Sequence, residues 1–223
     1  MFKAIDPHVV DWRAFDQVQV PPILRSALAC FVEQGYHGTT TRVLAAAAGL
    51  SIAGLYHHYP SKQAMLVALM DFAMEDLWAR STAAYEEAGD SVATQLQLHI
   101  ECLVLFHAHR GDLAFIASSE IRSLVSDART RYISTRDRQE EMLQRIVARG
   151  VDEGVFSTHN PRERTRALIT MCTGVAQWFR PGGTLTAENL ATEYAAIAEA
   201  ILTTGSKPPA RGQTRRGRSA PRL

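Results

Sequence analysis

The sequence predicts an all-α protein, and three observations lead to this fold class. Apolar residues recur three and four positions apart in nearly every segment after Pro22, which is the period of an amphipathic helix. Segments that alternate apolar and polar residues, as half-buried strands do, are scarce. Gly and Pro interrupt the helical pattern often enough to divide the chain into about nine helices. At 223 residues, 46% of them hydrophobic, the chain is long enough for one large or two small domains.

The N-terminal residues 1–19 show no helical pattern, and we expect them to form a flexible arm. Pro21 and Pro22 then suit the first turn of a helix, because a proline there costs no intrahelical hydrogen bond. We expect Gly35 to end this first helix, since glycine readily adopts the left-handed conformation found at helix ends.

Two short helices are expected next. Thr40 can cap a helix over residues 41–48, and Ser51 can cap a third helix, because each hydroxyl can accept a hydrogen bond from a free amide of the first turn. The turn between these two helices is only about three residues long. Residues 20–66 are therefore expected to form a helix-turn-helix domain.

A larger helical domain is expected over residues 67–204. Pro60 breaks the chain, and Ser61 can cap a long helix that runs to about Tyr85 and links the two domains. Further helices are expected at residues 91–109, 112–126, 128–150, 161–180 and 186–203. The tail, residues 205–223, is rich in Pro, Gly, Ser and Arg and nearly free of apolar residues, so we expect it to be disordered.

Composition limits the class of protein without naming a partner. The net charge is +1, but six basic residues and no acid follow Gly205, so the rest of the chain has a negative net charge. The net charge of the whole chain therefore neither supports nor excludes DNA binding. No stretch approaches the roughly 18 apolar residues of a membrane span, and the N-terminus has no signal-peptide pattern. We therefore expect a cytoplasmic protein with no membrane partner. Cys30, Cys102 and Cys172 lie far apart in apolar patterns, which favours reduced core thiols over disulfides or a metal site.

The most informative stretch runs from Gly35 to Leu66 and reads GYHGTTTRVLAAAAGLSIAGLYHHYPSKQAML. It resembles the DNA-binding domain of TetR-family regulators at many fixed spacings. The matching residues are Gly35, Tyr36, Thr39, Thr40, Leu44, Ala45, Ala48, Gly49, Leu50, Ser51, Ala53, Leu55, Tyr56, His58, Tyr59, Ser61, Lys62 and Met65. The matched alanines let two helices cross closely, and the matched leucines fill the small core beneath them.

This resemblance implies a set of DNA-binding residues. Thr40, Thr41 and Arg42 start the second helix, where a hydroxyl, free amides and a cation make a phosphate site. The helix from Ser51 to His58 would enter the major groove. By the family's pattern its readers are Ile52, Ala53, Gly54 and His57, while Tyr56, His58 and Lys62 resemble residues that contact the DNA backbone. The short apolar readers favour contacts with thymine methyl groups over bidentate arginine contacts.

This stretch has two alternative interpretations. It could be a packed three-helix unit whose adjacent histidines, His57 and His58, have no partner. Those histidines could instead hold a metal ion, but neighbouring residues on a helix point about 100° apart and do not readily share one ion.

The last two predicted helices carry apolar residues on more than one face, as helices do when they pack both inward and against a partner. In TetR-like proteins the corresponding pair usually builds a four-helix dimer interface. The expected dimer residues are Leu168, Met171, Val175, Leu190, Tyr194, Ile197 and Ile201. A monomeric core is the alternative. A homodimer would read two half-sites, so we expect a palindromic operator on double-stranded DNA.

The middle helices place polar residues among apolar neighbours, as a small-molecule site requires. The expected ligand-binding residues are His99, Leu103, Phe106, His107, Phe115, Ile116, Glu120, Met142, Ile146 and Trp178. Ordinary core packing is the alternative for each of them. A metal at His107 and His109 is disfavoured because residues two apart lie on different helix faces.

A further resemblance concerns the C-terminal segment Trp178-Phe-Arg-Pro-Gly-Gly-x-Leu-Thr-x-Glu-Asn-Leu, which is similar to TetR regulators of fatty-acid and steroid catabolism. Members of that branch often respond to acyl-CoA thioesters. Cations for a CoA head group would come from Arg122, Arg129, Arg131, Arg136 and Arg138, although nearby acids can instead pair with them on a solvated surface. The Arg-rich tail is a departure from the family pattern and could add nonspecific attraction to phosphate.

These inferences lead to one expected function. The chain is expected to be a transcriptional repressor that a small-molecule ligand, such as an acyl-CoA, releases from its operator, with no other cofactor. An architectural DNA-binding protein without an effector is the first alternative, but it would not need the large second domain. A helical enzyme is the second, but the sequence offers no combination of nucleophile, base and orienting group.

Overall fold

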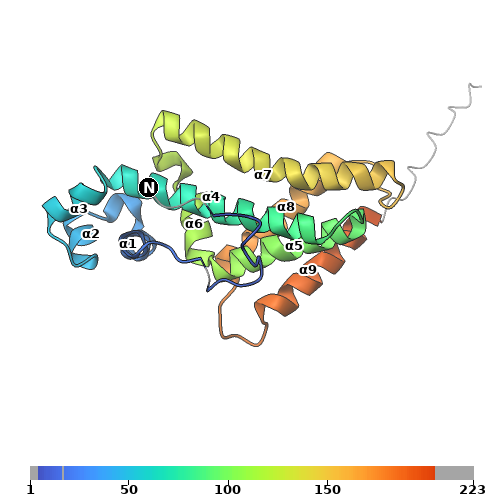
Figure 1. The fold of residues 1–223 in the computed structure, drawn as a ribbon, viewed down its shortest axis with the longest axis horizontal. Helices are drawn as coiled ribbons and strands as arrows, with labels where there is room; N and C mark the ends of the chain where they lie inside the picture. The colour runs from blue at the N-terminus through green and yellow to red at the C-terminus, as the bar shows by residue number, and fades with distance from the viewer. Residues whose placement is uncertain (1–4, 17, 204–223) are drawn as a thin grey trace, which may run out of the picture.

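The computed structural model describes residues 5–16 and 18–203, and within these ranges the chain is all α, as predicted. The described helices are α1 (Pro22–Gly38), α2 (Thr41–Ala47), α3 (Ile52–His58), α4 (Lys62–Glu87), α5 (Val92–His109), α6 (Gly111–Ser119), the 3₁₀ helix η1 (Glu120–Ser123), α7 (Ser126–Asp152), α8 (Pro161–Trp178) and α9 (Ala187–Thr203). Helices α1–α3 form one end of an elongated molecule, and α4, α5 and α7 run along its length (Figure 1). The tail expected to be disordered, residues 205–223, lies outside the described residues.

The predicted caps begin the helices where the sequence placed them. The side chains of Thr40, Ser51 and Ser61 each accept a hydrogen bond from the amide three residues on, at 3.3, 3.0 and 3.0 Å. Gly35 breaks α1 with a φ of 73°, and a short further turn carries the helix to Gly38. The single helix expected over residues 112–126 is instead α6 followed by η1, so the chain changes direction after Ser119.

Two hydrophobic cores run through the molecule. The first gathers α1–α3 around the N-terminal half of α4, from Met65 to Met74, and also takes in Leu113 and Ile116 of α6 and Tyr132 of α7. The second is built around α5, which packs against α4, α7, α8 and α9. Helix α4 therefore belongs to both cores, and the helix-turn-helix end rests on α6 as well as on α4.

All three cysteines are buried and free, which confirms the predicted core thiols. None of the described helices is both long enough and apolar enough to cross a membrane.

The flexible arm expected over residues 1–19 needs correction for its described residues. Trp12 is 2% exposed, and its ring nitrogen donates to the Glu87 carboxylate at 2.6 Å. The guanidinium of Arg80 donates to the backbone oxygens of Asp11, Trp12 and Ala14 at 3.0–3.2 Å. The arm is thus bound along α4 rather than free in solvent.

A buried ionic cluster holds this arm in place. Asp76 and Arg80 on α4 are both 0% exposed and pair at 2.7 Å, and Arg110 reaches the other oxygen of Asp76 at 3.1 Å. Arg110 also donates to the backbone oxygens of Phe15 and Val18. The Phe15 ring lies 3.9 Å from the Arg80 guanidinium and stacks on His109 at 4.6 Å. The arm supplies the carbonyl oxygens that two otherwise underpaired guanidinium groups require.

Candidate nucleic-acid interface and ligand cavity

The end of the molecule formed by α2 and α3 presents an open surface. Ile52 and Tyr56 are 42% and 44% exposed although both are large and apolar. The other predicted DNA-binding residues Thr40, Arg42, Ser51, Ala53, His57 and His58 are also exposed, whereas Thr41, Gly54 and Lys62 are half-buried. Exposed apolar side chains on a short helix suit contact with a groove more than with water.

The buried side of the same two helices explains why this surface is rigid. Leu44, Ala45 and Leu55 are almost fully buried in the first core. A Cβ at Gly54 would lie 3.3 Å from the Ser51 hydroxyl oxygen, the atom that caps α3 by accepting the Gly54 amide hydrogen. Glycine at this position leaves room for the cap and lets the backbone approach a partner closely.

Lys62 has a different structural role from the one expected of it. Its ammonium donates to the backbone oxygens of Tyr36 and Thr39 at 2.7 and 2.8 Å and lies 4.3 Å from the centre of the Tyr36 ring. The lysine therefore connects the C-terminal end of α1 and the following residue Thr39 to the start of α4. Contact between Lys62 and a DNA phosphate stays a prediction. Lys62 would also affect DNA binding indirectly, because its bonds to the backbone hold the residues before α2 in place.

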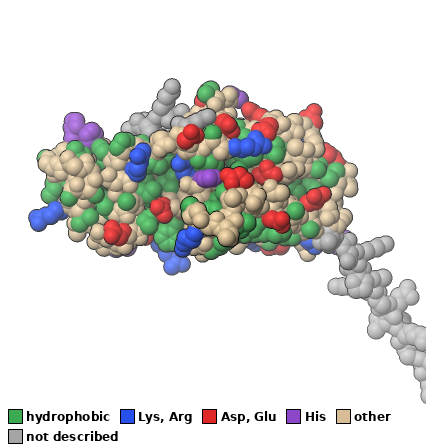
Figure 2. All heavy atoms as spheres, turned by 90° about the horizontal axis from the view of Figure 1, so that it is seen from below, with side chains coloured by type: hydrophobic (Ala, Val, Ile, Leu, Met, Phe, Trp, Pro, Cys, Tyr) green, Lys and Arg blue, Asp and Glu red, His purple; other side chains and the backbone are tan. Residues whose placement is uncertain are grey.

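Charge is unevenly spread along the molecule. Figure 2 shows histidine side chains at the end formed by α1–α3, while most acidic side chains on this face lie over the other half. An end that is poor in acids suits a polyanion better than the remainder of the surface does.

The second candidate site is a cavity of about 350 Å³ lined by five α-helices and the 3₁₀ helix η1. A cavity of this size can accept a small organic ligand. Its inner wall comes from α4 and α5, one end from α6 and η1, and the outer wall from α7 and α8. The lining residues are Ala73, Met74, Leu77, His99, Leu103, Phe106, His107, Ala114, Ala117, Ser118, Ile121, Tyr132, Arg136, Gln139, Glu140, Arg166, Ile169, Thr170 and Thr173.

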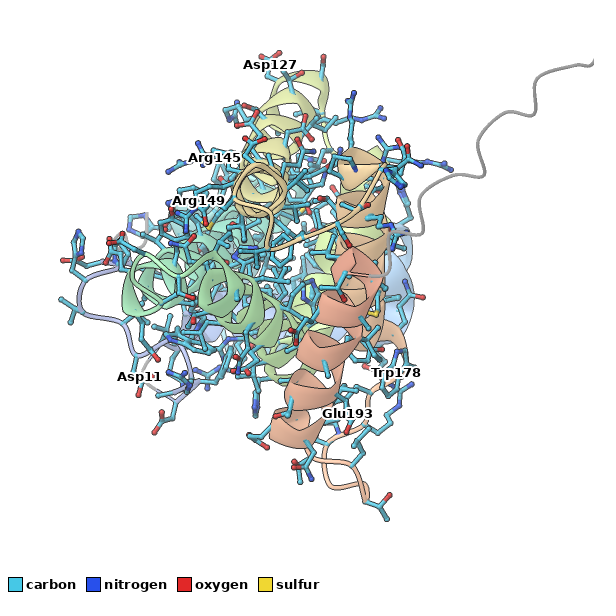
Figure 3. The ribbon with its side chains drawn as sticks, turned by 90° about the vertical axis from the view of Figure 1, so that its right-hand side faces the viewer. Asp11, Asp127, Arg145, Arg149, Trp178 and Glu193 are labelled. Carbon is cyan, nitrogen blue, oxygen red and sulfur yellow. The ribbon has the colours of Figure 1, made fainter. Side chains whose placement is uncertain are left out.

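Four of the ten expected ligand-binding residues line this cavity, namely His99, Leu103, Phe106 and His107, all from α5. The other six lie elsewhere. Phe115 and Trp178 are exposed, Ile116 packs in the first core, and Glu120 accepts a hydrogen bond from Ser123. Met142 and Ile146 line a separate hollow with Arg145 and Arg149, which Figure 3 labels.

Several cavity residues on α7 and α8 were not predicted from the sequence. Tyr132, Gln139 and Arg166 line the cavity, and so does Arg136, which the sequence suggests only as a cation for a CoA head group. Tyr132 and Gln139 are seven residues apart, which puts them on one face of α7, and this spacing was the available signal.

Burial keeps the two cavity histidines neutral. It lowers the pKa of His99 and of His107 to about 4, because a charged imidazole loses its hydration inside the protein. His107 Nδ1 donates to the backbone oxygen of Leu103 at 2.7 Å, which fixes its tautomer. Among the described residues there is no group of three or more His, Cys, Asp or Glu side chains that could hold a metal ion.

The residues expected at a dimer interface divide into two groups. Leu168, Val175 and Leu190 are buried in the second core of the chain itself, so a partner cannot reach them as the chain is folded here. Met171, Tyr194 and Ile201 are half-buried, and Ile197 is 41% exposed. Trp178, at the end of α8, is 48% exposed, and Figure 3 shows it and Glu193 on the flank of the molecule along which α9 runs.

The comparisons with known proteins agree with this arrangement. A model described as bacterial regulatory proteins, tetR family, matches residues 23–69, and one described as tetracyclin repressor-like, C-terminal domain, matches residues 89–202. The HTH-type transcriptional repressor KstR2 of Mycobacterium tuberculosis is 33% identical over 180 residues, which cover 78% of this chain and 88% of KstR2.

Solved structures show the same fold. The TetR family transcriptional regulator PfmR of Thermus thermophilus has a TM-score of 0.72 and 34% identity, over 81% of this chain and 96% of PfmR. A structure of AibR in complex with isovaleryl coenzyme A and operator DNA has a TM-score of 0.68 over 82% of this chain and 97% of AibR. At 24% identity, the likeness to AibR concerns the fold alone.

The C-terminal domain model by itself spans half of the chain. The tetR family model covers the helix-turn-helix, including the exposed helix α3. Regulators of this kind bind operator DNA and small-molecule effectors and are not enzymes. The chain belongs to the TetR family of bacterial regulatory proteins and is a DNA-binding transcriptional regulator.

Proposed function

We propose that this protein is a repressor that binds a palindromic operator as a homodimer and leaves it when a ligand of the acyl-CoA class enters the cavity. Its place of action would be the nucleoid, in the cytoplasm. The similarity to the transcriptional repressor KstR2 supports the repressor role. The similar fold of AibR, which was solved with isovaleryl coenzyme A and operator DNA, supports the ligand class.

One observation carries the proposal: the cavity lies where the two cores meet. Met74, Ala117 and Tyr132 line it from the first core, which also holds the helix-turn-helix. Leu103 and Phe106 line it from the second core. A ligand placed between the cores contacts both, so its binding energy can depend on how they sit relative to each other.

Coupling of this kind needs only a modest free energy. A ligand that prefers one arrangement of α4 and α6 by about 1–3 kcal/mol changes DNA affinity by about 5- to 150-fold. Both helices line the cavity and both pack against the helix-turn-helix end, so a small shift of either would reorient α3.

The ligand class is supported by the outer side of the cavity. Arg136 of α7 and Arg166 of α8 both line it and both are exposed, so they can meet the anionic part of a ligand whose apolar part is enclosed. Of the five arginines expected to serve a CoA head group, only Arg136 lines the cavity. Arg138 stacks instead on Trp78 at 3.5 Å.

Dimerisation is supported by the exposed flank of α8 and α9. Ile197 and Trp178 are the large apolar side chains there, and small residues such as Ala196 and Ala200 lie exposed beside Ile197. A two-fold pair of chains joined through this flank would present two copies of α3 to half-sites about 34 Å apart or a multiple of that distance.

The DNA-binding part is tested with gel shifts on the DNA that flanks the gene. We expect a discrete, salt-sensitive complex at a palindrome. His57→Ala should change the preference at one base pair by about 1–3 kcal/mol, whereas His8→Ala, an exposed histidine on the arm, should change nothing. Binding that shows no sequence preference would support the architectural alternative and refute the proposal.

The ligand part is tested by adding isovaleryl-CoA, octanoyl-CoA and decanoyl-CoA to the DNA complex. At least one should release the DNA. Arg136→Ala and Arg166→Ala should each raise the concentration required, and Arg162→Ala, an exposed arginine of α8 outside the cavity lining, is the matched control. Release that is unchanged in both cavity variants would refute the assignment of the CoA head group.

Oligomeric state is measured by light scattering on the purified protein. Ile197→Glu places a charge in the proposed interface and should yield monomers with weakened operator binding. Val125→Glu changes another exposed apolar residue, 57% exposed and directly before α7, and should leave the dimer intact. A monomeric wild-type chain would refute this part of the proposal.

A further inference from the structure

We infer that His99 and Gln139 form a hydroxyl-recognition subsite on the wall of the cavity, so that the ligand bears a hydroxyl group on its apolar part. This inference rests on the proposed function in one respect, because it takes the cavity to be where the ligand binds. It goes beyond that function by naming a chemical group and the two side chains that select it.

The first observation is a set of buried polar atoms without partners. His99 is 1% exposed, and neither of its ring nitrogens has a hydrogen-bond partner among the described residues. The same holds for Oε1 of Gln139, which is also buried. A buried polar atom left unpaired costs about 1–3 kcal/mol, and folded proteins contain few of them. Three such atoms on the lining of one cavity point to a ligand that supplies the missing partners.

The second observation is that Gln139 is held in position. Its Nε2 donates to the hydroxyl of Ser81 at 2.6 Å, which fixes the side chain with Oε1 left without a partner among the described residues. The Ser81 hydroxyl also lies 3.9 Å from the thiol of Cys102, which is three residues after His99 on α5 and therefore on the same side of that helix. Ser81 thus ties Gln139 of α7 to the side of α5 that carries His99.

The chemistry of the free atoms selects the group. Because burial lowers the pKa of His99 to about 4, its ring is neutral at pH 7 and offers one donor and one acceptor. Gln139 Oε1 adds a second acceptor. A hydroxyl group both donates and accepts, so it can satisfy the imidazole N–H and one acceptor together. A ketone only accepts and leaves both acceptors unpaired, and a methylene group leaves all three atoms unpaired.

The remainder of the cavity disfavours a charged group at this subsite. The neighbouring lining is apolar, with Leu103, Phe106 and Leu77. A carboxylate beside His99 would be a buried charge facing a neutral ring, which is strongly unfavourable. The cations that line the cavity, Arg136 and Arg166, belong to the exposed outer side. A charged group is therefore expected there, and a neutral hydroxyl against His99 and Gln139.

The test compares probes that differ only at this group. Cyclohexanol, cyclohexanone and methylcyclohexane are small enough for the cavity and lack a CoA head group. Their dissociation constants are measured on the full chain by NMR titration. Cyclohexanol should bind at least about tenfold more tightly than either analogue, which is the ratio that corresponds to one satisfied buried hydrogen bond. Equal affinities, or no detectable binding of the alcohol, would overturn the inference.

Variants decide whether these two side chains are responsible. His99→Phe and Gln139→Leu should each remove most of the preference for the alcohol while methylcyclohexane binds as well as before or better. Gln144→Leu makes the same change on α7 outside the cavity lining, where the amide bonds to Glu140 instead, and should keep the preference. A preference that survives in both cavity variants would also overturn the assignment.

A second set of probes separates this inference from the proposed function. Decanoyl-CoA is compared with hydroxydecanoyl-CoA thioesters that carry the hydroxyl at successive positions along the chain. If decanoyl-CoA releases DNA as well as every hydroxylated thioester, the subsite is refuted and the proposed function stands. If no thioester acts but the cyclohexanol preference holds and is lost in His99→Phe, the acyl-CoA proposal fails and the subsite stands.

Discussion

Asp76→Asn is the most informative single change for the fold, because it removes the carboxylate from a largely buried ionic cluster. Asp76 is 0% exposed and accepts hydrogen bonds from Arg80 at 2.7 Å and Arg110 at 3.1 Å. With asparagine in its place, two guanidinium groups keep their positive charges in the protein interior without a counter-ion. Removal of one member of a buried ion pair typically costs about 3–5 kcal/mol. We expect a loss in that range, which for a chain of this size corresponds to roughly 10 °C in Tm.

The assay is urea unfolding followed by circular dichroism, at one protein concentration because the stability of an oligomer depends on concentration. Glu163→Gln is the matched control. It breaks a carboxylate–arginine pair of similar length, 3.0 Å to Arg166, that lies in solvent and should cost about 1 kcal/mol or less. Trypsin cleavage after Arg13 gives a second readout, since the same cluster binds the arm. Equal losses in the two variants, with unchanged cleavage, would refute this account of the cluster.

Three further predictions concern the core. Between about pH 6.5 and 4 the free energy of unfolding should fall as pH falls, because His99 and His107 of the unfolded chain take up protons that the folded chain does not bind. Each histidine contributes a slope of up to about 1.4 kcal/mol per pH unit. Urea titrations at pH 7, 6 and 5 measure this slope, and His99→Gln should reduce it. Gly150→Ala should destabilise the chain by about 1–3 kcal/mol, because the added Cβ would lie 2.1 Å from the buried ring of Phe156. Gly38→Ala is the control and should have little effect in the same assay, because the nearest atom would lie 4.0 Å from its Cβ. The buried thiols should resist a disulfide reagent in native protein and all react in urea, so rapid labelling of the native chain would contradict their burial.

Local signals carried the prediction of the helix-turn-helix end. Thr40, Ser51 and Ser61 act on amides three residues away, so their effect is contained in a short stretch of sequence. The same is true of Gly35, whose positive φ needs no distant partner to explain it.

The arm and the cavity depend on contacts that no local pattern contains. Arg80 meets carbonyl oxygens more than sixty residues earlier in the chain, and with Asp76 it forms an i, i+4 pair that in sequence resembles a solvated helix face. For the cavity, the face of α5 was predictable, but the helices that cover it were not. The sequence predicts one helix over residues 112–126, whereas α6 ends at Ser119. Glu120 therefore lies on η1, where it accepts a hydrogen bond from Ser123, and does not line the cavity.

The bound arm has a mechanical consequence. The helix-turn-helix end is joined to the body of the protein at both of its own ends, by the arm before α1 and by α4 after α3. These two connections add to the packing of α1 on α6, so the end has little freedom to turn unless α4 or α6 moves with it. In a pair of such chains, the two recognition helices would keep a narrow range of mutual orientations, and an operator with one base pair inserted between its half-sites would be bound poorly.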